Sequence, residues 1–415
     1  MRLLLVLPVA VATASAQQAV PTRTLAKPDI EYSEPFSQLV GIRELKDGRV
    51  IVGDTRDRTL QVIDLAAGRA TPIGREGSGP DEWLSPQRVL AWPGDSTVIF
   101  DPQNNRMLVV GPNARPARSF DPSGAPPGAP GAGRGGVAGA GAGAGAGGRN
   151  VQFRGALIPR GTDSRGRIYS QGAGVSIGPD FSIVQSDTAP IVRFDPSSNT
   201  HDTVAYVHLA PRPTAPARPI DAGGGRQMMV FGTALTPFAP ADDWNVTSDG
   251  QVVIARVADY RIDVVGVDGK TARGTPTRFT PVPVTEQDKE NWRRAQQAAR
   301  AGGSGGVRVN IGGETRTVPL PPTPEPTEWP ATKPPFQNSS VWSAPNGEVW
   351  VLRTGAASDK TTSADVFNAQ GRHVSRVVFP ERTRLVGFGT NAVYLVRTDD
   401  DDLLYLQRHA LTSLR

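Results

Sequence analysis

The sequence predicts an all-β protein, a six-bladed β-propeller built from four-stranded antiparallel blades. A short turn rich in Gly, Asp and Asn recurs six times, and each turn is followed by a strand of alternating apolar residues. The same turn and strand can be followed along the whole chain, which indicates one small sheet repeated around an axis. The six strands are expected at residues 49–54, 96–101, 167–172, 251–256, 348–353 and 392–397.

The other strands of each blade are expected from the same alternation and from tight turns of the Asp-Gly and Asn-Gly kind. Blade one takes residues 39–45, 49–54, 60–64 and 71–74, and blade two takes 88–92, 96–101, 106–110 and 117–120. Blade three takes 156–159, 167–172, 191–195 and 203–207, and blade four takes 243–246, 251–256, 261–267 and 277–279. Blade five takes 341–343, 348–353, 363–368 and 373–379, and blade six takes 385–388, 392–397 and 403–408.

Blade six therefore lacks a fourth strand at its C-terminal end. An unpaired strand edge favours unwanted pairing, and a propeller removes it by borrowing a strand from the other terminus. Residues 30–32 have strand character and precede blade one. We expect them to pair with residues 403–408 and close the ring.

The first 16 residues resemble a secretory signal: Arg2, an apolar run, and Ala14-Ser15-Ala16 as a cleavage site. We therefore expect export to the periplasm or the medium after cleavage near Ala16, and a single monomeric propeller over 17–415. The chain has no Cys, which excludes disulfides and thiolate sites. Its net charge of +5 is small and no run of Lys or Arg is present, which argues against nucleic-acid binding. No segment after the signal is apolar enough to cross a membrane, so we expect no transmembrane span.

Part of blades one and two carries a resemblance to a known group. Residues 73–83 read IGREGSGPDEW, and Asp101, Asn104 and Arg106 follow. The combination resembles bacterial exported six-bladed propellers related to NHL repeats, in which a Gly-x-Gly-Pro-Gly-Glu-aromatic segment precedes a blade. Asp81 stands where that group commonly has Gly. The resemblance covers roughly residues 40–115 and implies the fold, but little function, because most members have no assigned biochemistry.

The long insertions fall on one face of the predicted propeller. Connections between strands two and three of a blade share a face with the connections between blades, and every long segment occupies one of these positions. Residues 121–150, rich in Gly and Ala, should be disordered. Residues 281–337, between blades four and five, should form a small helix (Glu286–Ala301) that begins at a capping box, Thr285-Glu286-Gln287-Asp288. A hairpin at 307–311 and 314–318 and a Pro-rich return should follow. Such a face is where binding normally resides.

The last position of the second strand is the main candidate for a site. Arg256, Arg353 and Arg397 occupy it in blades four to six, and a cluster of guanidinium groups binds carboxylate, sulfate or phosphate well. The hypothesis is a binding patch for a small anionic ligand, a glycan or a protein. The alternative is that each Arg pairs within the structure, for example with Asp259, Asp359 or the acidic turn 399–402.

A second hypothesis concerns a metal and an enzymatic activity. Asp54, Asp101 and Glu76 would supply oxygen ligands for calcium or another divalent ion in a propeller hydrolase, lactonase or lyase. The four His residues show no His-x-His or His-Glu-x-x-His spacing, and no Gly-x-Ser-x-Gly elbow is present. The sequence therefore favours an exported, non-catalytic binding propeller without a cofactor, and keeps the metal-dependent enzyme as the alternative.

Overall fold

The computed structural model shows a six-bladed β-propeller of four-stranded antiparallel sheets. It describes residues 20–122, 158–172, 174–177, 183–211, 214–221, 227–233, 236–301, 306–311, 314–319, 326 and 328–411. The expected signal (1–16) and almost all of the Gly/Ala-rich loop (121–150) lie outside the described residues. No helix within the described ranges is long and apolar enough to cross a membrane.

The six blades follow one another along the chain. Blade one contains β3 (Leu39–Glu44), β4 (Val50–Asp54), β5 (Thr59–Asp64) and β6 (Arg69–Pro72), and blade two contains β9 (Arg88–Trp92), β10 (Ser96–Asp101), β11 (Arg106–Val110) and β12 (Pro116–Phe120). Blade three contains β13 (Pro159–Thr162), β14 (Ile168–Gln171), β17 (Thr188–Asp195) and β18 (Thr200–His208), and blade four contains β21 (Asp243–Val246), β22 (Val252–Arg256), β23 (Arg261–Val265) and β24 (Thr271–Arg273). Blade five contains β29 (Val341–Ser343), β30 (Val349–Leu352), β31 (Ser363–Phe367) and β32 (His373–Val378), and blade six contains β33 (Thr383–Gly389), β34 (Ala392–Thr398) and β35 (Leu404–Ala410), with β2 (Ile30–Glu31) as its fourth strand.

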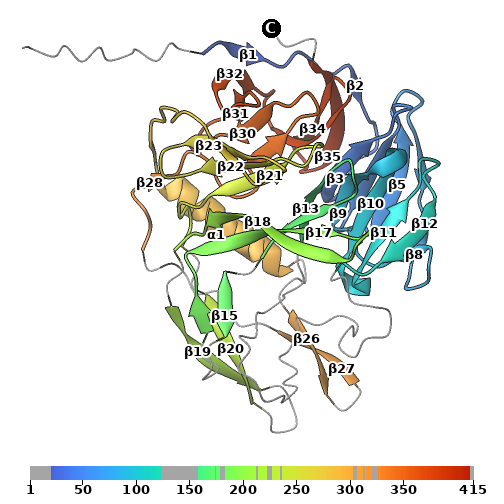
Figure 1. The fold of residues 1–415 in the computed structure, drawn as a ribbon, viewed down its shortest axis with the longest axis horizontal. Helices are drawn as coiled ribbons and strands as arrows, with labels where there is room; N and C mark the ends of the chain where they lie inside the picture. The colour runs from blue at the N-terminus through green and yellow to red at the C-terminus, as the bar shows by residue number, and fades with distance from the viewer. Residues whose placement is uncertain are drawn as a thin grey trace, which may run out of the picture.

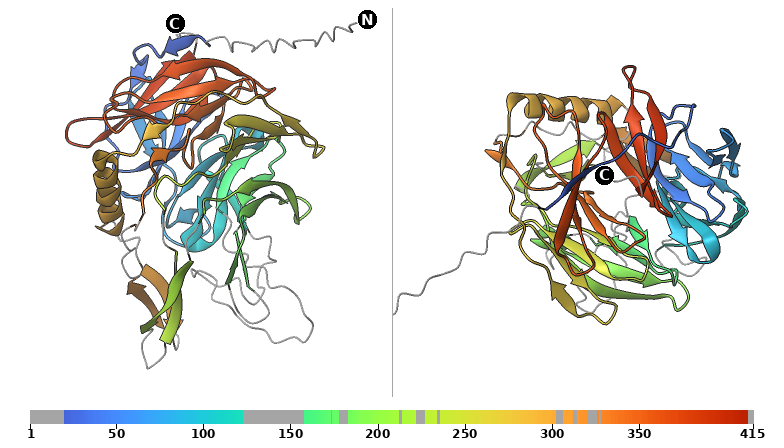
Figure 2. Two further views of the ribbon diagram at one scale, coloured as in Figure 1. Left: turned by 90° about the vertical axis from the view of Figure 1, so that its left-hand side faces the viewer. Right: turned by 90° about the horizontal axis from the view of Figure 1, so that it is seen from above.

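The first strand of each blade is innermost. These strands contact one another in the order β33, β3, β9, β13, β21 and β29, and the right-hand view of Figure 2 shows the sheets arranged around the resulting ring. Apolar side chains of each blade pack against the next blade, so the core consists of clusters between sheets, such as Tyr169, Ile191, Trp244 and Ile254 between blades three and four.

The turn between the first two strands explains why the repeat is visible in the sequence. A residue within one position of its end has a positive φ in every blade, and this conformation favours Gly or Asn. The residues are Gly48, Gly94, Gly166, Gly250, Gly347 and Asn391.

The N-terminal segment closes the ring, as expected. Ile30 pairs with Arg408 and Glu31 with Gln407 in the antiparallel pair of β2 and β35. An additional strand, β1 (Thr22–Thr24), pairs in parallel with β32 at the outer edge of blade five. The expectation of only four strands in that sheet was therefore incomplete.

The fourth strand of blade four was predicted wrongly at residues 277–279. The structure places it at β24, immediately after a tight turn in which Gly266 N donates to Lys270 O, at 2.8 Å. Asp-Gly is a strong hairpin signal, and the Asp268-Gly269 turn joins β23 directly to β24 as an antiparallel hairpin.

The remaining elements lie in the connections. They are β7 (Arg75–Glu76), β8 (Glu82–Trp83), β15 (Val175–Ile177), β16 (Ile183–Gln185), β19 (Thr214–Asp221), β20 (Gln227–Thr233), β25 (Val282–Pro283), α1 (Glu286–Ala301), β26 (Gly306–Ile311), β27 (Glu314–Pro319) and β28 (Thr332–Lys333), besides the 3-10 turns Pro93–Asp95 and Pro102–Asn104. The hairpins β19–β20 and β26–β27 project from the same side of the propeller, away from β1 (Figures 1 and 2). We call this side the insertion face.

Helix α1 begins at the capping box that the sequence predicts. Asp288 N donates to Thr285 Oγ1 at 3.3 Å, and Thr285 N donates to Asp288 Oδ2 at 2.9 Å. The buried Lys333 of β28 donates from Nζ to Asp288 Oδ1 at 2.5 Å and to Gly355 O at 2.9 Å. Lys333 therefore attaches the helix to blade five.

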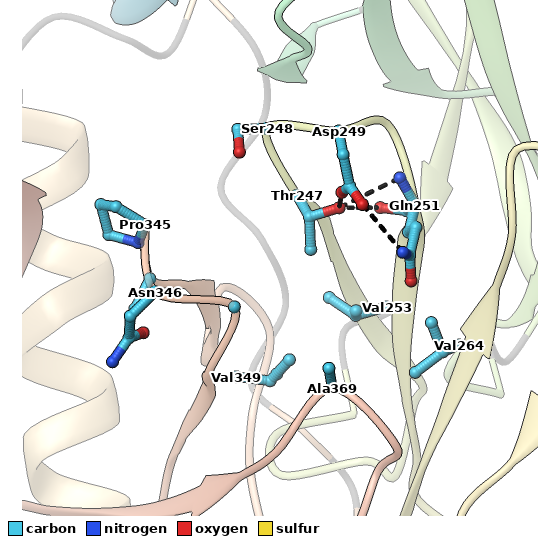
Figure 3. Close-up of a pocket in the computed structure, with 12 residues that line it drawn as sticks. Thr247, Ser248, Asp249, Gln251, Val253, Val264, Pro345, Asn346, Val349 and Ala369 are labelled. Atoms are coloured by element: carbon cyan, nitrogen blue, oxygen red, sulfur yellow. Dashed lines mark hydrogen bonds between the residues drawn. The ribbon is translucent and has the colours of Figure 1, made fainter.

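The opposite side carries tight turns, and we call it the turn face. Between the turns of blades four and five it contains a cavity of about 320 Å³ (Figure 3).

Candidate functional site

The second-strand ends all lie at the insertion face, because the connection from strand two to strand three leaves there. Asp54 and Asp101 end β4 and β10, and Arg256 ends β22. Arg353 directly follows β30, and Arg397 is the penultimate residue of β34. Their place on this face follows from the blade topology. Ligand binding by the three Arg residues stays a prediction.

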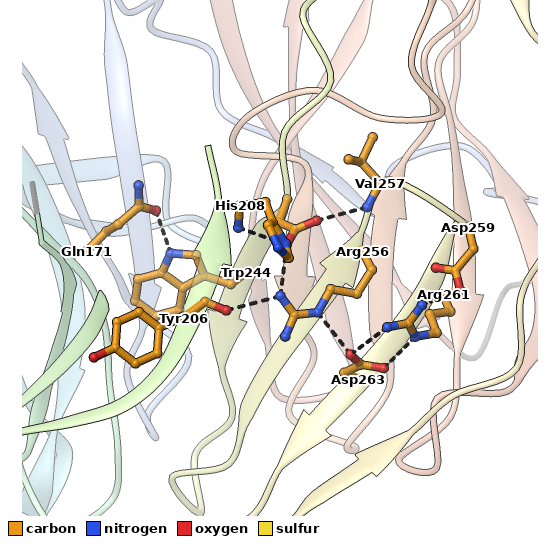
Figure 4. Close-up of polar contacts among 10 residues, drawn as sticks. Gln171, Tyr206, His208, Trp244, Arg256, Val257, Asp259, Arg261 and Asp263 are labelled. Carbon is orange, nitrogen blue, oxygen red and sulfur yellow. Dashed lines mark hydrogen bonds and ion pairs between the residues drawn. The ribbon is translucent and has the colours of Figure 1, made fainter. Parts of the chain in front are cut away.

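Arg256 is held between two buried carboxylates (Figure 4). Its Nη1 donates to Asp242 Oδ2 at 2.8 Å, and its Nε donates to Asp263 Oδ2 at 2.9 Å. Nη1 also donates to Tyr206 O at 3.0 Å, which joins blade four to β18. The charge of this guanidinium is thus compensated inside the protein, by Asp242 and Asp263 and not by Asp259, which pairs with Arg261.

Asp242 organises the same junction. Its Oδ1 accepts from Val257 N at 3.0 Å, and its Oδ2 accepts from His208 N at 3.0 Å and lies 2.9 Å from His208 Nδ1. Burial acts to raise the pKa of Asp242, but the hydrogen bonds from His208, Arg256 and Val257 outweigh it and lower the pKa. This carboxylate therefore stays ionised and ties three loops of the insertion face together.

Arg353 and Arg397 also have internal partners. Arg353 Nη1 donates to Asp365 Oδ2 at 2.9 Å, and Arg397 makes a bidentate contact with Glu31, at 2.9 Å from Nε and 2.8 Å from Nη2. The sequence suggested Asp359 and the acidic turn 399–402 as partners, but the structure pairs these arginines with Asp365 and Glu31. Because Glu31 belongs to β2, the Arg397 pair attaches the N-terminal segment to blade six.

The three residues of the metal hypothesis are each engaged elsewhere. Asp54 accepts four backbone N–H groups, from Ser37 and Gln38 on Oδ2 and from Arg56 and Asp57 on Oδ1. Asp101 accepts Leu84 N and Ser85 N, and the exposed Glu76 pairs with Arg58 at 2.7 Å. In the part of the chain that the structure describes, no three His, Cys, Asp or Glu residues converge as a metal site.

The motif behind the family resemblance is a clamp on the loop from blade one to blade two. Asn104 Nδ2 donates to Gly77 O at 2.9 Å and to Asp101 Oδ2 at 2.7 Å, while Arg106 Nη1 donates to Gly79 O at 2.8 Å. Glu82 Oε2 accepts Gly79 N at 2.7 Å, which closes the loop on itself. The spacing of these residues is therefore explained by a structural role.

A different set of arginines lies at the axial mouth of the insertion face. They stand near the start of the innermost strands: Arg88 in β9, Arg160 in β13 and Arg384 in β33. We call them the mouth arginines. Sequence reasoning missed them because it aligned the ends of the second strands. Only Arg88 lies in a predicted first strand, because the expected strands 156–159 and 385–388 leave out Arg160 and Arg384. The observed bounds of β13 and β33 place both residues at the second position of a first strand.

Arg88, like Arg384 and unlike Arg160, forms no ion pair with a residue that the structure describes. Side chains along a strand point alternately to its two faces, so Arg88 lies on the same face of β9 as Leu90 and Trp92. Leu90 and Trp92 pack against the apolar cluster between blades two and three. Arg88 is partly buried, and within the described residues no acidic side chain forms an ion pair with it. Desolvation, and then the charge of Arg160, lower the pKa of Arg88.

Arg160 and Arg384 complete the group. Arg160 Nη2 pairs with Asp243 Oδ1 at 2.5 Å and lies over the Trp244 ring. Arg384 donates from Nη2 to Leu39 O at 3.2 Å. Arg384 is accessible to solvent, yet surrounding protein lowers its pKa by desolvation. Among the described residues Asp243 is the one acid that pairs with the group, so the three arginines together carry an excess of positive charge.

Comparison with known proteins gives structural likeness without a family. No protein-family model and no curated protein matches the sequence. A putative exported protein from Bacteroides fragilis is 10% identical, with a TM-score of 0.42, over 94% of each chain. A member of the DUF4221 family from Bacteroides vulgatus is 9% identical, with a TM-score of 0.39, over 94% of this chain and 97% of that one. A gluconolactonase from Xanthomonas campestris is 9% identical, with a TM-score of 0.38, over 95% and 99%. These values assign no activity to the chain.

Proposed function

We propose that the protein is an exported, non-catalytic binding propeller that takes an anionic ligand at the axial mouth of its insertion face. The observation that supports this proposal is Arg88, a partly buried guanidinium beside Arg160 with no acidic partner among the described residues. Burying a cation without an anion costs free energy, because the cation loses part of its hydration. An oxyanion that binds beside Arg88 replaces that lost interaction with water.

The chemistry of the mouth arginines defines the ligand class. A planar guanidinium offers paired N–H donors to carboxylate, sulfate or phosphate, and Arg88 and Arg384 have these donors largely uncommitted. Arg256, Arg353 and Arg397 then act as supports, because their carboxylate partners fix the loops around the mouth. The proposal thus keeps the predicted face and the anionic ligand. It moves the ligand contact from the ends of the second strands to the starts of the innermost first strands.

The test measures binding of galacturonate and inorganic phosphate by isothermal titration calorimetry at low ionic strength. Arg88→Ala should weaken binding at least tenfold, since one hydrogen bond to a charged group contributes about 1.5–3 kcal/mol. Arg88→Lys should recover part of the affinity, because it keeps the charge and loses the fork. Arg69→Ala, at an exposed position on the outer strand β6, is the matched control and should bind as the native chain does. If neither anion binds, or if Arg88→Ala binds unchanged, the proposal is wrong.

A further inference from the structure

The cavity on the turn face lies between two rigid turns (Figure 3). In the turn of blade four, Thr247 N donates to Gln251 O at 2.9 Å and Gly250 N donates to Thr247 O at 2.9 Å. The turn of blade five repeats this pattern from Ala344 to Glu348, at 2.8 Å and 3.0 Å. Both walls are therefore preformed, and a ligand would enter without ordering a loop.

The cavity combines an apolar floor with a polar rim. Val253, Val264 and Val349 form the floor and belong to the core cluster between blades four and five. The rim carries the side chains of Asp249 and Gln251, and the exposed Ala369 lies at its other edge. At about 320 Å³ the space falls at the lower end of small-molecule sites, which range over about 300–1,000 Å³.

Asp249 gives the rim a charge. Its Oδ1 accepts the Thr247 hydroxyl and its Oδ2 accepts Gln251 Nε2 at 2.8 Å, so the carboxylate is held in place by neutral donors. Among the described residues no Lys, Arg or His lines the cavity, and none pairs with Asp249. Although partial burial raises its pKa, the bonds from Thr247 and Gln251 lower it, which keeps the group ionised.

We infer that this cavity binds a small molecule that carries one ammonium group on a compact apolar body. The ammonium pairs with Asp249 at the rim, and the hydrocarbon covers the three valines of the floor. A neutral analogue lacks the ion pair, and an anion meets an uncompensated carboxylate. The inference is independent of the proposed function, since the cavity and the mouth arginines lie on opposite faces and require ligands of opposite charge.

The experiment compares cyclohexylamine with cyclohexanol, its neutral counterpart, by isothermal titration calorimetry on the full chain at pH 7. The amine should bind saturably, and at least about fivefold more tightly than the alcohol, as expected for one partly exposed ion pair. Asp249→Asn should remove this preference. Asp268→Asn, which changes an exposed carboxylate in another turn of blade four, should keep it.

A second variant tests the location. Ala369→Phe places a ring at the exposed edge of the cavity without changing the core, so it should abolish binding while the thermal midpoint stays close to that of the native chain. Absence of amine binding to the native chain, equal binding of amine and alcohol, or unchanged binding by Asp249→Asn or Ala369→Phe would overturn the inference.

Discussion

Replacing Asp365 by Asn tests whether Arg353 is a structural residue. Asp365 is fully buried in β31 and accepts hydrogen bonds from Arg353 Nη1, Arg376 Nε and the Tyr260 hydroxyl, at 2.9, 2.9 and 2.7 Å. His373 Nε2 lies 3.2 Å away. The substitution keeps the shape and removes the charge, which leaves two guanidinium groups facing a neutral amide.

The expected loss in the free energy of unfolding of Asp365→Asn follows from this geometry. Removing one partner of a fully buried ion pair costs about 3–5 kcal/mol. The side chains of Arg353 and Arg376 are 18% and 33% exposed, so water solvates part of the charge left behind and we expect a loss of about 3 kcal/mol, at the lower end of this range. Asp268→Asn is the control, since its carboxylate is exposed and surface changes stay within about 0.5 kcal/mol. Urea unfolding followed by tryptophan fluorescence measures both differences at neutral pH.

The stability difference between the native protein and Asp365→Asn should also depend on pH. Burial acts to raise the pKa of Asp365, but the surrounding donors and the charge of Arg353 hold it well below its usual range. A carboxyl with a lowered folded pKa contributes stability above its unfolded pKa of about 3.9, and loses it as the pH falls toward the folded pKa. The stability difference between native and Asp365→Asn proteins should therefore be constant from about pH 5 to 7 and shrink below about pH 4. A difference under about 1 kcal/mol at neutral pH would refute the reasoning and free Arg353 for a ligand.

Two further predictions concern the N-terminal segment and the metal hypothesis. Tyr32→Ala should lower the free energy of unfolding by about 3–5 kcal/mol, because Tyr32 is 4% exposed and packs in the core of blades one and six; urea unfolding against the exposed Glu34→Ala control checks this. Calcium at millimolar concentration should leave the thermal midpoint unchanged, because the oxygens of Asp54 and Asp101 already accept backbone N–H groups. A calcium-dependent rise that Asp54→Asn or Asp101→Asn removes would restore the metal hypothesis.

The blades could be predicted because their signals are local. Alternation along a strand and a left-handed residue at each turn need only adjacent residues, so the second strands and the hairpin β26–β27 were found nearly to the residue. The capping box marked the start of α1 in the same way. The closing strand β2 followed from counting unpaired edges.

The errors fall where local signals are weak or compete. Strand β1 has three residues and pairs in parallel with a strand far along the chain, so no nearby turn announces it. For blade four, β24 has three exposed residues and no apolar alternation, so the strand was expected at 277–279 although the Asp268-Gly269 turn places it directly after β23.

The sequence by itself determined the architecture, the ring closure and the face that carries the insertions. Only the tertiary structure decided which arginines are compensated. Arg256, Arg353 and Arg397 find their carboxylates on Asp242, Asp263, Asp365 and Glu31, residues brought close by strand pairing rather than by position in the chain. Arg88 has no such acid among the described residues. The physical reason is that a charge is paired through space over a few ångströms, and in a propeller those distances join strands of one sheet or of neighbouring blades.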